Sequence, residues 1–169
     1  MPVIAAEISV RPMAASDAAQ VLAAYAEGIE DGRATFETVC PGWDDWDAAH
    51  LEKCRFVGLI DDRVAGWAAL GPVSWRDCYR GVAEVSVYVA REARGKGLGR
   101  RLLETLVEDS ERAGFWTLQG GTFEDNAASL ALQRACGFRV VGRRERIAQR
   151  NGQWKSTILT ERRSAKVGV

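Results

Sequence analysis

A glycine-rich basic turn is the stretch of this sequence best suited to bind an anion. Residues 94–99 have the sequence Arg-Gly-Lys-Gly-Leu-Gly, and apolar residues at helical spacing begin at Leu98. The first N–H groups of a helix lack intrahelical acceptors, and glycines let a phosphate approach the backbone closely. The turn therefore predicts a phosphate site or, equally, a basic helix start that is only solvated.

Two common nucleotide motifs do not fit this turn. A Walker loop needs Ser or Thr after Gly-Lys, but Gly97 follows Lys96. A dinucleotide Gly-x-Gly-x-x-Gly pattern would need glycine where Arg100 or Leu102 stands. The chain has 23 basic and 23 acidic residues, so no net charge attracts nucleic acid or an anionic membrane. We therefore expect a local phosphate site, with neither nucleic acid nor membrane as a partner.

Glu84 is the best candidate for a general base. It lies in an otherwise apolar strand pattern, Gly81–Ala90, just before the basic turn. Burial there would raise the pKa of its carboxyl group toward the range useful for proton abstraction near neutral pH. The alternative is a structural carboxylate paired with an arginine.

Metal and thiol chemistry have little support in the sequence. The four cysteines lie far apart without Cys-x-x-Cys spacing, and His50 is the one histidine. We expect no metal site, no disulfide framework, and cysteines that behave as small buried hydrophobes. His50 is expected at a helix end and the six tryptophans mostly in the core. The basic run Gly142–Arg150 is expected to be a solvated strand face.

Hydrophobic periodicity predicts the elements that position these residues. Alternating patterns predict strands at 7–12, 81–90 and 115–123, and strand pairs around the turns Asp61–Asp62 and Asn151–Gly152. Helical spacing predicts helices at 15–29, 43–51, 97–112 and 126–137. This order implies one mixed α/β sheet with helices on its faces. The N-terminus lacks a basic region followed by a long apolar core, so we expect a cytoplasmic protein.

Two motifs resemble those of the GNAT N-acetyltransferase superfamily. Arg94-x-x-Gly97-x-Gly99 is similar to its Arg/Gln-x-x-Gly-x-Gly/Ala signature, and "NAASLALQRACGF" is similar to its Asn-containing helix that ends in Gly-Phe. The stretches "ATFET", "WRDCYRGVAEVSVYV" and "GWAALGPVS" further resemble the phosphinothricin, methionine sulfoximine and arsinothricin acetyltransferases. The resemblance covers nearly the whole chain. It implies one domain over residues 1–169, with a core at about 7–162 and a mostly antiparallel sheet.

The resemblance implies acetyl-CoA as co-substrate, with its pyrophosphate on the basic turn. Backbone N–H groups near Val87 to Val89 would stabilise an oxyanion if their strand splays from its neighbour, and the family has a bulge there. Asn126 and Ser129 would contact the pantetheine arm, or serve only as helix N-cap and N3. The residues expected to bind acetyl-CoA are Val87, Tyr88, Val89, Arg94, Gly95, Lys96, Gly97, Leu98, Gly99, Arg100, Asn126 and Ser129.

The resemblance also implies that Glu84 is the base, acting directly or through water. Many family members have a tyrosine as general acid at the position of Gln133, so the acid role is unassigned here. A thiol with a pKa of about 8.5 leaves adequately as the thiolate. No cysteine is placed as an acyl carrier, so direct attack in a ternary complex is expected.

Two loops are expected to bind the acceptor. Arg76 would grip a carboxylate bidentately, and the subgroup has an arginine and a tyrosine at Arg76 and Tyr79. Trp75 would close the pocket, with Phe36 as an apolar wall and Thr35 and Glu37 as polar contacts. For each of these residues a surface or packing role is the alternative.

The sequence thus predicts an enzyme that acetylates the α-amino group of a small amino acid or a toxic analogue, as in herbicide or antibiotic resistance. Acetylation of protein N-termini or other amines is one alternative, and a non-catalytic acyl-CoA-binding regulator is another. The resemblance also implies a homodimer that pairs through the C-terminal half.

Overall fold

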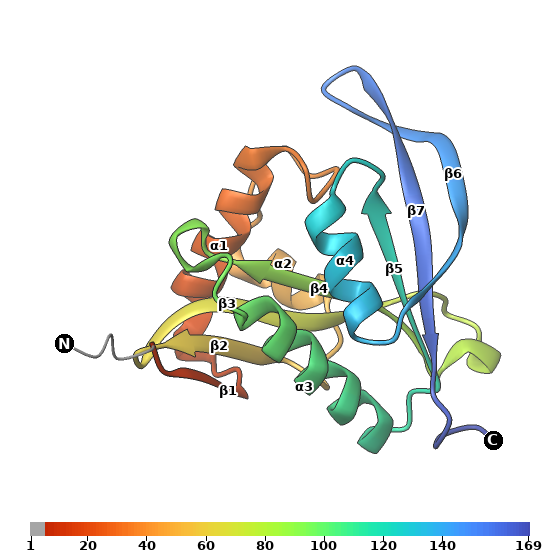
Figure 1. Cartoon of the computed structure of the whole chain (residues 1–169), viewed down its shortest axis with the longest axis horizontal. Helices are drawn as coiled ribbons and strands as arrows, with labels where there is room; N and C mark the ends of the chain where they lie inside the picture. The colour runs from red at the N-terminus through yellow and green to blue at the C-terminus, as the bar shows by residue number, and fades with distance from the viewer. Residues whose placement is uncertain (1–5) are drawn as a thin grey trace.

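A single seven-stranded sheet organises the chain (Figure 1). The computed structural model describes residues 6–169, so residues 1–5 of the expected domain lie outside the described part. The strand order is β1-β2-β3-β4-β5-β7-β6, and only the β4–β5 pair is parallel. The strands are β1 (Ile8–Pro12), β2 (Phe56–Ile60), β3 (Arg63–Pro72), β4 (Val82–Val89), β5 (Thr117–Phe123), β6 (Arg139–Arg150) and β7 (Gln153–Arg163). The expected mostly antiparallel α/β sheet is confirmed.

Helices cover both faces of the sheet, as expected. α3 packs against β1 to β4 on one face, and α1 packs against β3 and β4 on the other. The α-helices are α1 (Ala18–Asp31), α2 (Trp43–Ala49), α3 (Leu98–Arg112) and α4 (Ala127–Ala135). Short 3-10 turns at Ala15–Asp17, Asp77–Tyr79 and Arg91–Ala93 were not expected.

Both expected hairpin turns are confirmed by their backbone angles. Asp61 and Asp62 join β2 to β3 with φ of 48° and 63°, and Asn151 and Gly152 join β6 to β7 with φ of 49° and 78°. Two successive positive φ values match the right-handed twist of the flanking strands, and Asn, Asp and Gly adopt them at least cost.

The core has one layer on each face of the sheet. Leucines of α3 fill the first layer, and glycines of the underlying strands let the helix approach closely. A Cβ on Gly58 would lie 2.6 Å from Leu98 Cδ1, and one on Gly66 would lie 3.2 Å from Leu102 Cδ1. The second layer is aromatic, with Trp67 stacked on Tyr88 at a centroid distance of 5.0 Å.

The expectations that the tryptophans lie mostly in the core and that the cysteines are small buried hydrophobes are both wrong. Trp46 and Trp67 are fully buried, but Trp75 is 94% exposed and Trp154 57% exposed. Cys54 is the one buried cysteine, at 7% exposure, and burial raises the pKa of its thiol to about 12. Cys78 is exposed because, like Trp75, it lies in the loop that joins β3 to β4 outside the sheet. The expected place of His50, at the end of α2, is confirmed.

Within residues 6–169, no helix is both long enough and apolar enough to cross a membrane.

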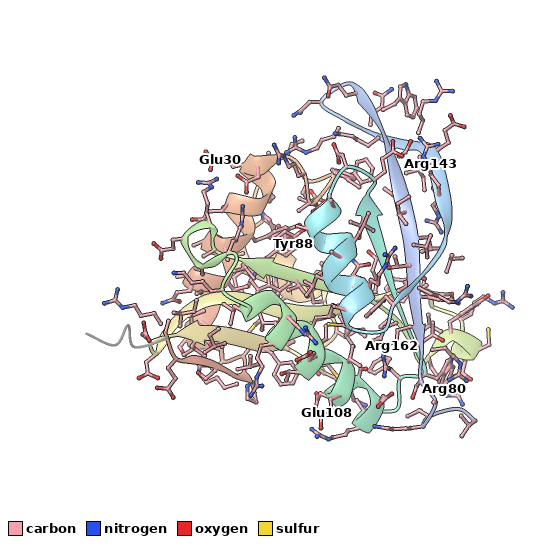
Figure 2. All side chains as sticks on the ribbon, in the orientation of Figure 1. Glu30, Arg80, Tyr88, Glu108, Arg143 and Arg162 are labelled. Atoms are coloured by element: carbon pink, nitrogen blue, oxygen red, sulfur yellow. The ribbon has the colours of Figure 1, made fainter. Side chains whose placement is uncertain are left out.

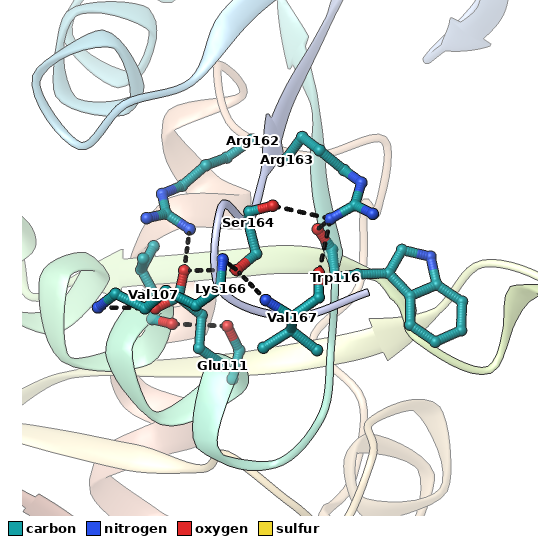
Figure 3. A network of polar contacts seen from close by, with 9 residues as sticks. Val107, Glu111, Trp116, Arg162, Arg163, Ser164, Lys166 and Val167 are labelled. Carbon is teal, nitrogen blue, oxygen red and sulfur yellow. Dashed lines mark hydrogen bonds and ion pairs between the residues drawn. The ribbon is translucent and has the colours of Figure 1, made fainter. Parts of the chain in front are cut away.

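A polar network anchors the C-terminal segment to the end of α3 (Figure 3). The Glu111 side chain is 9% exposed and accepts hydrogen bonds from Ser164 Oγ at 2.8 Å and Arg162 Nη1 at 3.0 Å. Lys166 Nζ lies 3.4 Å from the other carboxylate oxygen. The Ser164 hydroxyl, followed by the two cations, holds the pKa of Glu111 below its usual range.

Replacing Glu111 by Gln should therefore make folding stability less dependent on pH. A depressed carboxyl pKa stabilises the folded state above the unfolded pKa, and that contribution is lost as pH falls through the folded pKa. Equilibrium denaturation should show a cost of roughly 1–3 kcal/mol for E111Q at pH 7, and a smaller cost toward about pH 3. The exposed Glu108, paired with Arg112 on the same helix, is the control, and E108Q should cost under about 0.5 kcal/mol. Equal costs for the two variants would contradict this role of Glu111.

Candidate active site

A large cleft opens where β4 separates from β5. The parallel pairing runs only from Val82 to Glu84, whereas β4 stays paired with β3 as far as Val89. The cleft has a volume of about 960 Å³, within the range of small-molecule sites. Its walls come from the end of α1 and the loop after it, β4, the glycine-rich turn, β5 and α4.

The expected splay of β4 from its neighbour is present, but the expected bulge is not seen in its pairing with β3. The β3–β4 register runs from Gly66–Val89 to Pro72–Ala83 without a shift. Val85, Val87 and Val89 therefore all face the α3 side, and Tyr88 faces α1, as the alternation predicts. The edge of β4 beyond Glu84 has no ladder partner on the β5 side, so its backbone groups can take a ligand.

The glycine-rich turn forms one end of the cleft. Gly97 is the N-cap of α3 with φ of 89°, and Gly95 has φ of 75°, a region that favours glycine. The turn residues that line the cleft are Arg94, Gly95, Gly97, Leu98 and Gly99. Lys96 and Arg100 are not among the lining residues, and Arg100 forms an ion pair with Glu104 at 2.8 Å.

Arg94 braces the turn against the end of α1. Its Nε donates to Val89 O at 3.0 Å, and its guanidinium forms an ion pair with Asp31. Arg91 also binds Asp31, at 2.8 Å, and these two arginines hold the pKa of Asp31 below its usual range. The Arg94 side chain is still 42% exposed beside the cleft, so a role in binding phosphate stays a prediction.

Glu84 is exposed at the cleft, and the expectation that it is buried is wrong. The reason is the separation of β4 from β5, which begins immediately after the Glu84–Gln119 pair and leaves this side chain at the opening. Gln119 Nε2 donates to Glu84 Oε2 at 3.2 Å. Within residues 6–169 no cation lies within ion-pair distance of Glu84, so the arginine-paired alternative is not observed.

Asn126 and Ser129 line the cleft at the start of α4, and the expected N-cap is confirmed. Asn126 Oδ1 accepts from the Ser129 N–H at 3.2 Å, while its Nδ2 donates to Arg33 O at 3.1 Å. The helix cap thus also holds the loop that follows α1. Gly137 ends the helix with φ of 87°, as expected.

Gln133 lies buried at the base of the cleft. Its Nε2 donates to Thr122 Oγ1 at 2.8 Å and to Ser129 Oγ at 3.3 Å, and its Oε1 accepts from the hydroxyl of Thr160. Because Ser129 Oγ accepts from the amide, its own hydroxyl hydrogen remains available to a ligand. Gln133 has no acidic proton, so it does not supply the acid.

The loop after α1 forms the opposite wall. Thr35, Phe36 and Glu37 all line the cleft, and Phe36 packs edge-on against Phe123 at a centroid distance of 4.8 Å. These residues lie where the sequence predicted an acceptor wall.

Two tyrosines that line the cleft were not predicted as acceptor ligands, although Tyr88 is among the residues expected to bind acetyl-CoA. Tyr25 and Tyr88 line the cleft with their ring centroids 4.8 Å apart, and in the view of Figure 2 Tyr88 lies between α1 and α4. Burial raises the pKa of both phenols, so both remain protonated donors at neutral pH. The sequence carried one signal of this close contact, which is the glycine at position 28 inside a helical pattern. A Cβ at Gly28 would lie 2.7 Å from the Tyr88 ring.

Three expected acceptor residues are not among those lining the cleft. Trp75, Arg76 and Tyr79 lie in the exposed loop before β4, shown in yellow-green in Figure 1, and the Arg76 guanidinium lies 5.8 Å from the Tyr79 ring centroid. Their role in acceptor binding stays a prediction. Among residues 6–169, no group of three His, Cys, Asp or Glu side chains is arranged to hold a metal ion.

Comparison with known proteins places the chain in a family. The Acetyltransferase (GNAT) family profile matches residues 20–138. The chain therefore belongs to the GNAT family of acetyltransferases. It is 35% identical to a phosphinothricin N-acetyltransferase of Alcaligenes faecalis, over 91% of this chain and 81% of the relative.

Two further similarities extend over most of the chain. A methionine sulfoximine/methionine sulfone acetyltransferase of Pseudomonas aeruginosa is 31% identical over 86% of this chain and 88% of its own length. The crystal structure of a phosphinothricin acetyltransferase from Sinorhizobium meliloti, in complex with acetyl-CoA, superposes with a TM-score of 0.85. That alignment covers 98% of this chain and 91% of the other, at 28% identity.

Proposed function

We propose that this enzyme transfers the acetyl group of acetyl-CoA to the α-amino group of a small amino acid or of an analogue such as phosphinothricin or methionine sulfoximine. The observation that carries the proposal is a single cleft in which Glu84 and the glycine-rich turn border the same space. The names of the two relatives and the acetyl-CoA bound in the related crystal structure support the acceptor and donor classes.

The donor is proposed to lie along the opened edge of β4. Its pyrophosphate would accept hydrogen bonds from backbone N–H groups of the turn around Gly97 and Gly99, where the start of α3 favours negative charge. Ser129, whose hydroxyl hydrogen is available, would meet the pantetheine arm from α4. Backbone N–H groups of β4 near Val87 to Val89 would face the thioester carbonyl.

The transfer is proposed to be a direct attack in a ternary complex. The neutral amine attacks the thioester carbonyl, so that a C–N bond forms and the C–S bond breaks. Glu84 takes the amine proton, directly or through one water, and coenzyme A leaves as the thiolate. The carboxylate is suited to this task because it is exposed at the cleft and free of a cationic partner among the described residues. No side chain is assigned as acid.

An acceptor panel tests the proposal. Thiol release from acetyl-CoA should be measured with phosphinothricin, methionine sulfoximine, free amino acids and short peptides. We expect the highest kcat/KM for a free amino acid or analogue. Preference for peptides would favour acetylation of protein N-termini instead. Calorimetric binding of acetyl-CoA without turnover of any amine would favour a non-catalytic regulator.

Replacing Gly97 by Val should weaken acetyl-CoA binding strongly. The residue has φ of 89°, which a β-branched side chain adopts only with strain, so the start of α3 and its N–H groups would shift. Isothermal titration should show a Kd for acetyl-CoA at least about tenfold higher. Gly142, which has ordinary backbone angles and no neighbour within 4 Å of an added Cβ, offers the control G142A, which should bind normally. An unchanged Kd for G97V would contradict the assignment of the turn.

A homodimer and a cytoplasmic location are part of the same proposal. They rest on the resemblance to the phosphinothricin and methionine sulfoximine acetyltransferases, as does a role in resistance to a toxic amino-acid analogue.

A further inference from the structure

Arg150 differs from the other arginines of the basic run on β6. Arg143, Arg144 and Arg146 are exposed, as the interpretation of this run as a solvated face predicts. Arg150 is instead half-buried and reaches across the molecule to the loop that follows α1. Neither the proposed chemistry nor the packing of the sheet accounts for this reach.

The shape of the β6–β7 hairpin brings Arg150 there. β5 pairs with β7 only as far as Phe123–Thr157, so the outer part of the hairpin extends beyond β5, toward the loop after α1 (Figure 1). The β6–β7 register shifts between Arg144 and Ala148, and Arg146 within the shift has φ of 44°. Such bulges bend a strand and redirect its side chains. Arg150 is the last residue of β6, just before the turn at the tip of the bent β6–β7 hairpin.

The guanidinium of Arg150 binds three backbone carbonyl groups. Its Nη2 donates to Ile29 O at 2.7 Å and to Glu37 O at 3.4 Å, and its Nε donates to Thr35 O at 3.1 Å. The first carbonyl belongs to the last turn of α1, where a cation is favoured by the helix dipole. The other two carbonyls belong to the cleft wall itself.

The position of Gly32 fits this arrangement. Gly32 ends α1 with φ of 70°, and its N–H also donates to Ile29 O at 3.1 Å. A Cβ at this residue would lie 3.0 Å from Arg150 Nη1. The chain therefore reverses direction next to the guanidinium of Arg150. This one planar group, which has several donors, joins the end of α1 to the loop that follows it.

We propose that Arg150 is a positioning residue for the acceptor wall. By fixing the carbonyls of Thr35 and Glu37 it sets where Phe36 and Glu37 stand, and thereby which acceptor side chains fit the cleft. The kinetic consequence of this role rests on the proposed function. The guanidinium itself forms no hydrogen bond with the turn 94–99, so its direct effect falls on the acceptor wall and not on the acetyl-CoA end of the cleft.

Substitution of Arg150 tests the proposal with Arg144 as a matched control. Arg144 is an exposed arginine of the same strand, and it has no hydrogen-bond or ion-pair partner for its side chain among residues 6–169. R150A should raise KM for the acceptor roughly tenfold, leave KM for acetyl-CoA within about twofold, and narrow the discrimination between acceptors of different size. R150K, a single point charge, should recover part of the loss, and R144A should match the wild type.

Hydrogen exchange gives a second readout that does not depend on turnover. In R150A, amides of residues 29–38 should exchange at least about tenfold faster than in the wild type, while those of β3 and α3 stay unchanged. If the wild type acetylates no acceptor, the proposed function fails and the exchange experiment still decides the role of Arg150. Equal exchange of this segment in R150A and R144A would overturn the proposal, as would equal rises in both KM values.

Discussion

Replacing Glu84 by Gln should lower kcat for acetyl transfer by roughly two to four orders of magnitude, because the amide cannot accept the proton of the attacking amine. The substitution keeps the size of the side chain and an oxygen that can accept from Gln119. Affinity for acetyl-CoA should therefore be nearly unchanged. Steady-state kinetics, with the Kd for acetyl-CoA measured by titration, separates the two quantities.

The pH dependence gives a sharper form of this result. Hydroxide becomes more available to take the proton of the attacking amine as pH rises, so the deficit in kcat of E84Q should narrow toward high pH. Glu108 is exposed on α3 and is not among the residues that line the cleft, so E108Q is the control and should follow the wild-type profile. A normal kcat combined with weakened acetyl-CoA binding in E84Q would show that Glu84 serves structure and not proton transfer.

Replacing Leu102 by Ala should destabilise the protein by roughly 3–5 kcal/mol and lower Tm by on the order of 10 °C. Leu102 is a fully buried residue of α3 that faces the sheet, and its Cδ1 would lie 3.1 Å from a Cβ on Gly58 and 3.2 Å from one on Gly66. The glycines have no side chains that could move into the space left behind. The resulting cavity would therefore persist and its full cost would be felt.

Thermal and chemical denaturation measure this loss. Val140 on β6 is 54% exposed, so V140A should change the free energy of unfolding by less than about 0.5 kcal/mol. α3 begins at the glycine-rich turn, so loosening its packing should also weaken acetyl-CoA binding. A loss below about 1 kcal/mol for L102A would contradict the close packing of α3 on the sheet.

Local patterns predicted the elements because each carries its own signal. The Asp61–Asp62 and Asn151–Gly152 turns have residues that tolerate positive φ, and the leucines of α3 repeat at helical spacing. Gly97 lies between a strand pattern and a helix pattern. Its position between the two patterns correctly predicted a turn at the start of α3. Such features depend on neighbours in the chain, which a sequence displays directly.

Long-range contacts could not be predicted in the same way. The exposure of Glu84 depends on where β4 separates from β5, and the reach of Arg150 depends on a bulge and on a loop 115 residues away. Tyr25 lies at an apolar position of the helical pattern at 15–29, but the contact with Tyr88 of β4 that places both side chains along the cleft is a long-range one. The loop with Trp75 and Arg76 was expected at the acceptor site from the chemistry of Arg76 and from the resemblance, and in this chain it lies outside the cleft lining.

The central claim is that one cleft brings acetyl-CoA and the amine of a small amino acid together for direct transfer. The most direct measurement is product analysis by mass spectrometry after incubation of the enzyme with acetyl-CoA and either phosphinothricin or methionine sulfoximine. We predict an N-acetylated amino acid and free coenzyme A in equal amounts, with formation of both abolished or strongly slowed in E84Q. Release of coenzyme A without an acetylated amino acid, or no reaction with either acceptor or any other small amine, would contradict the claim.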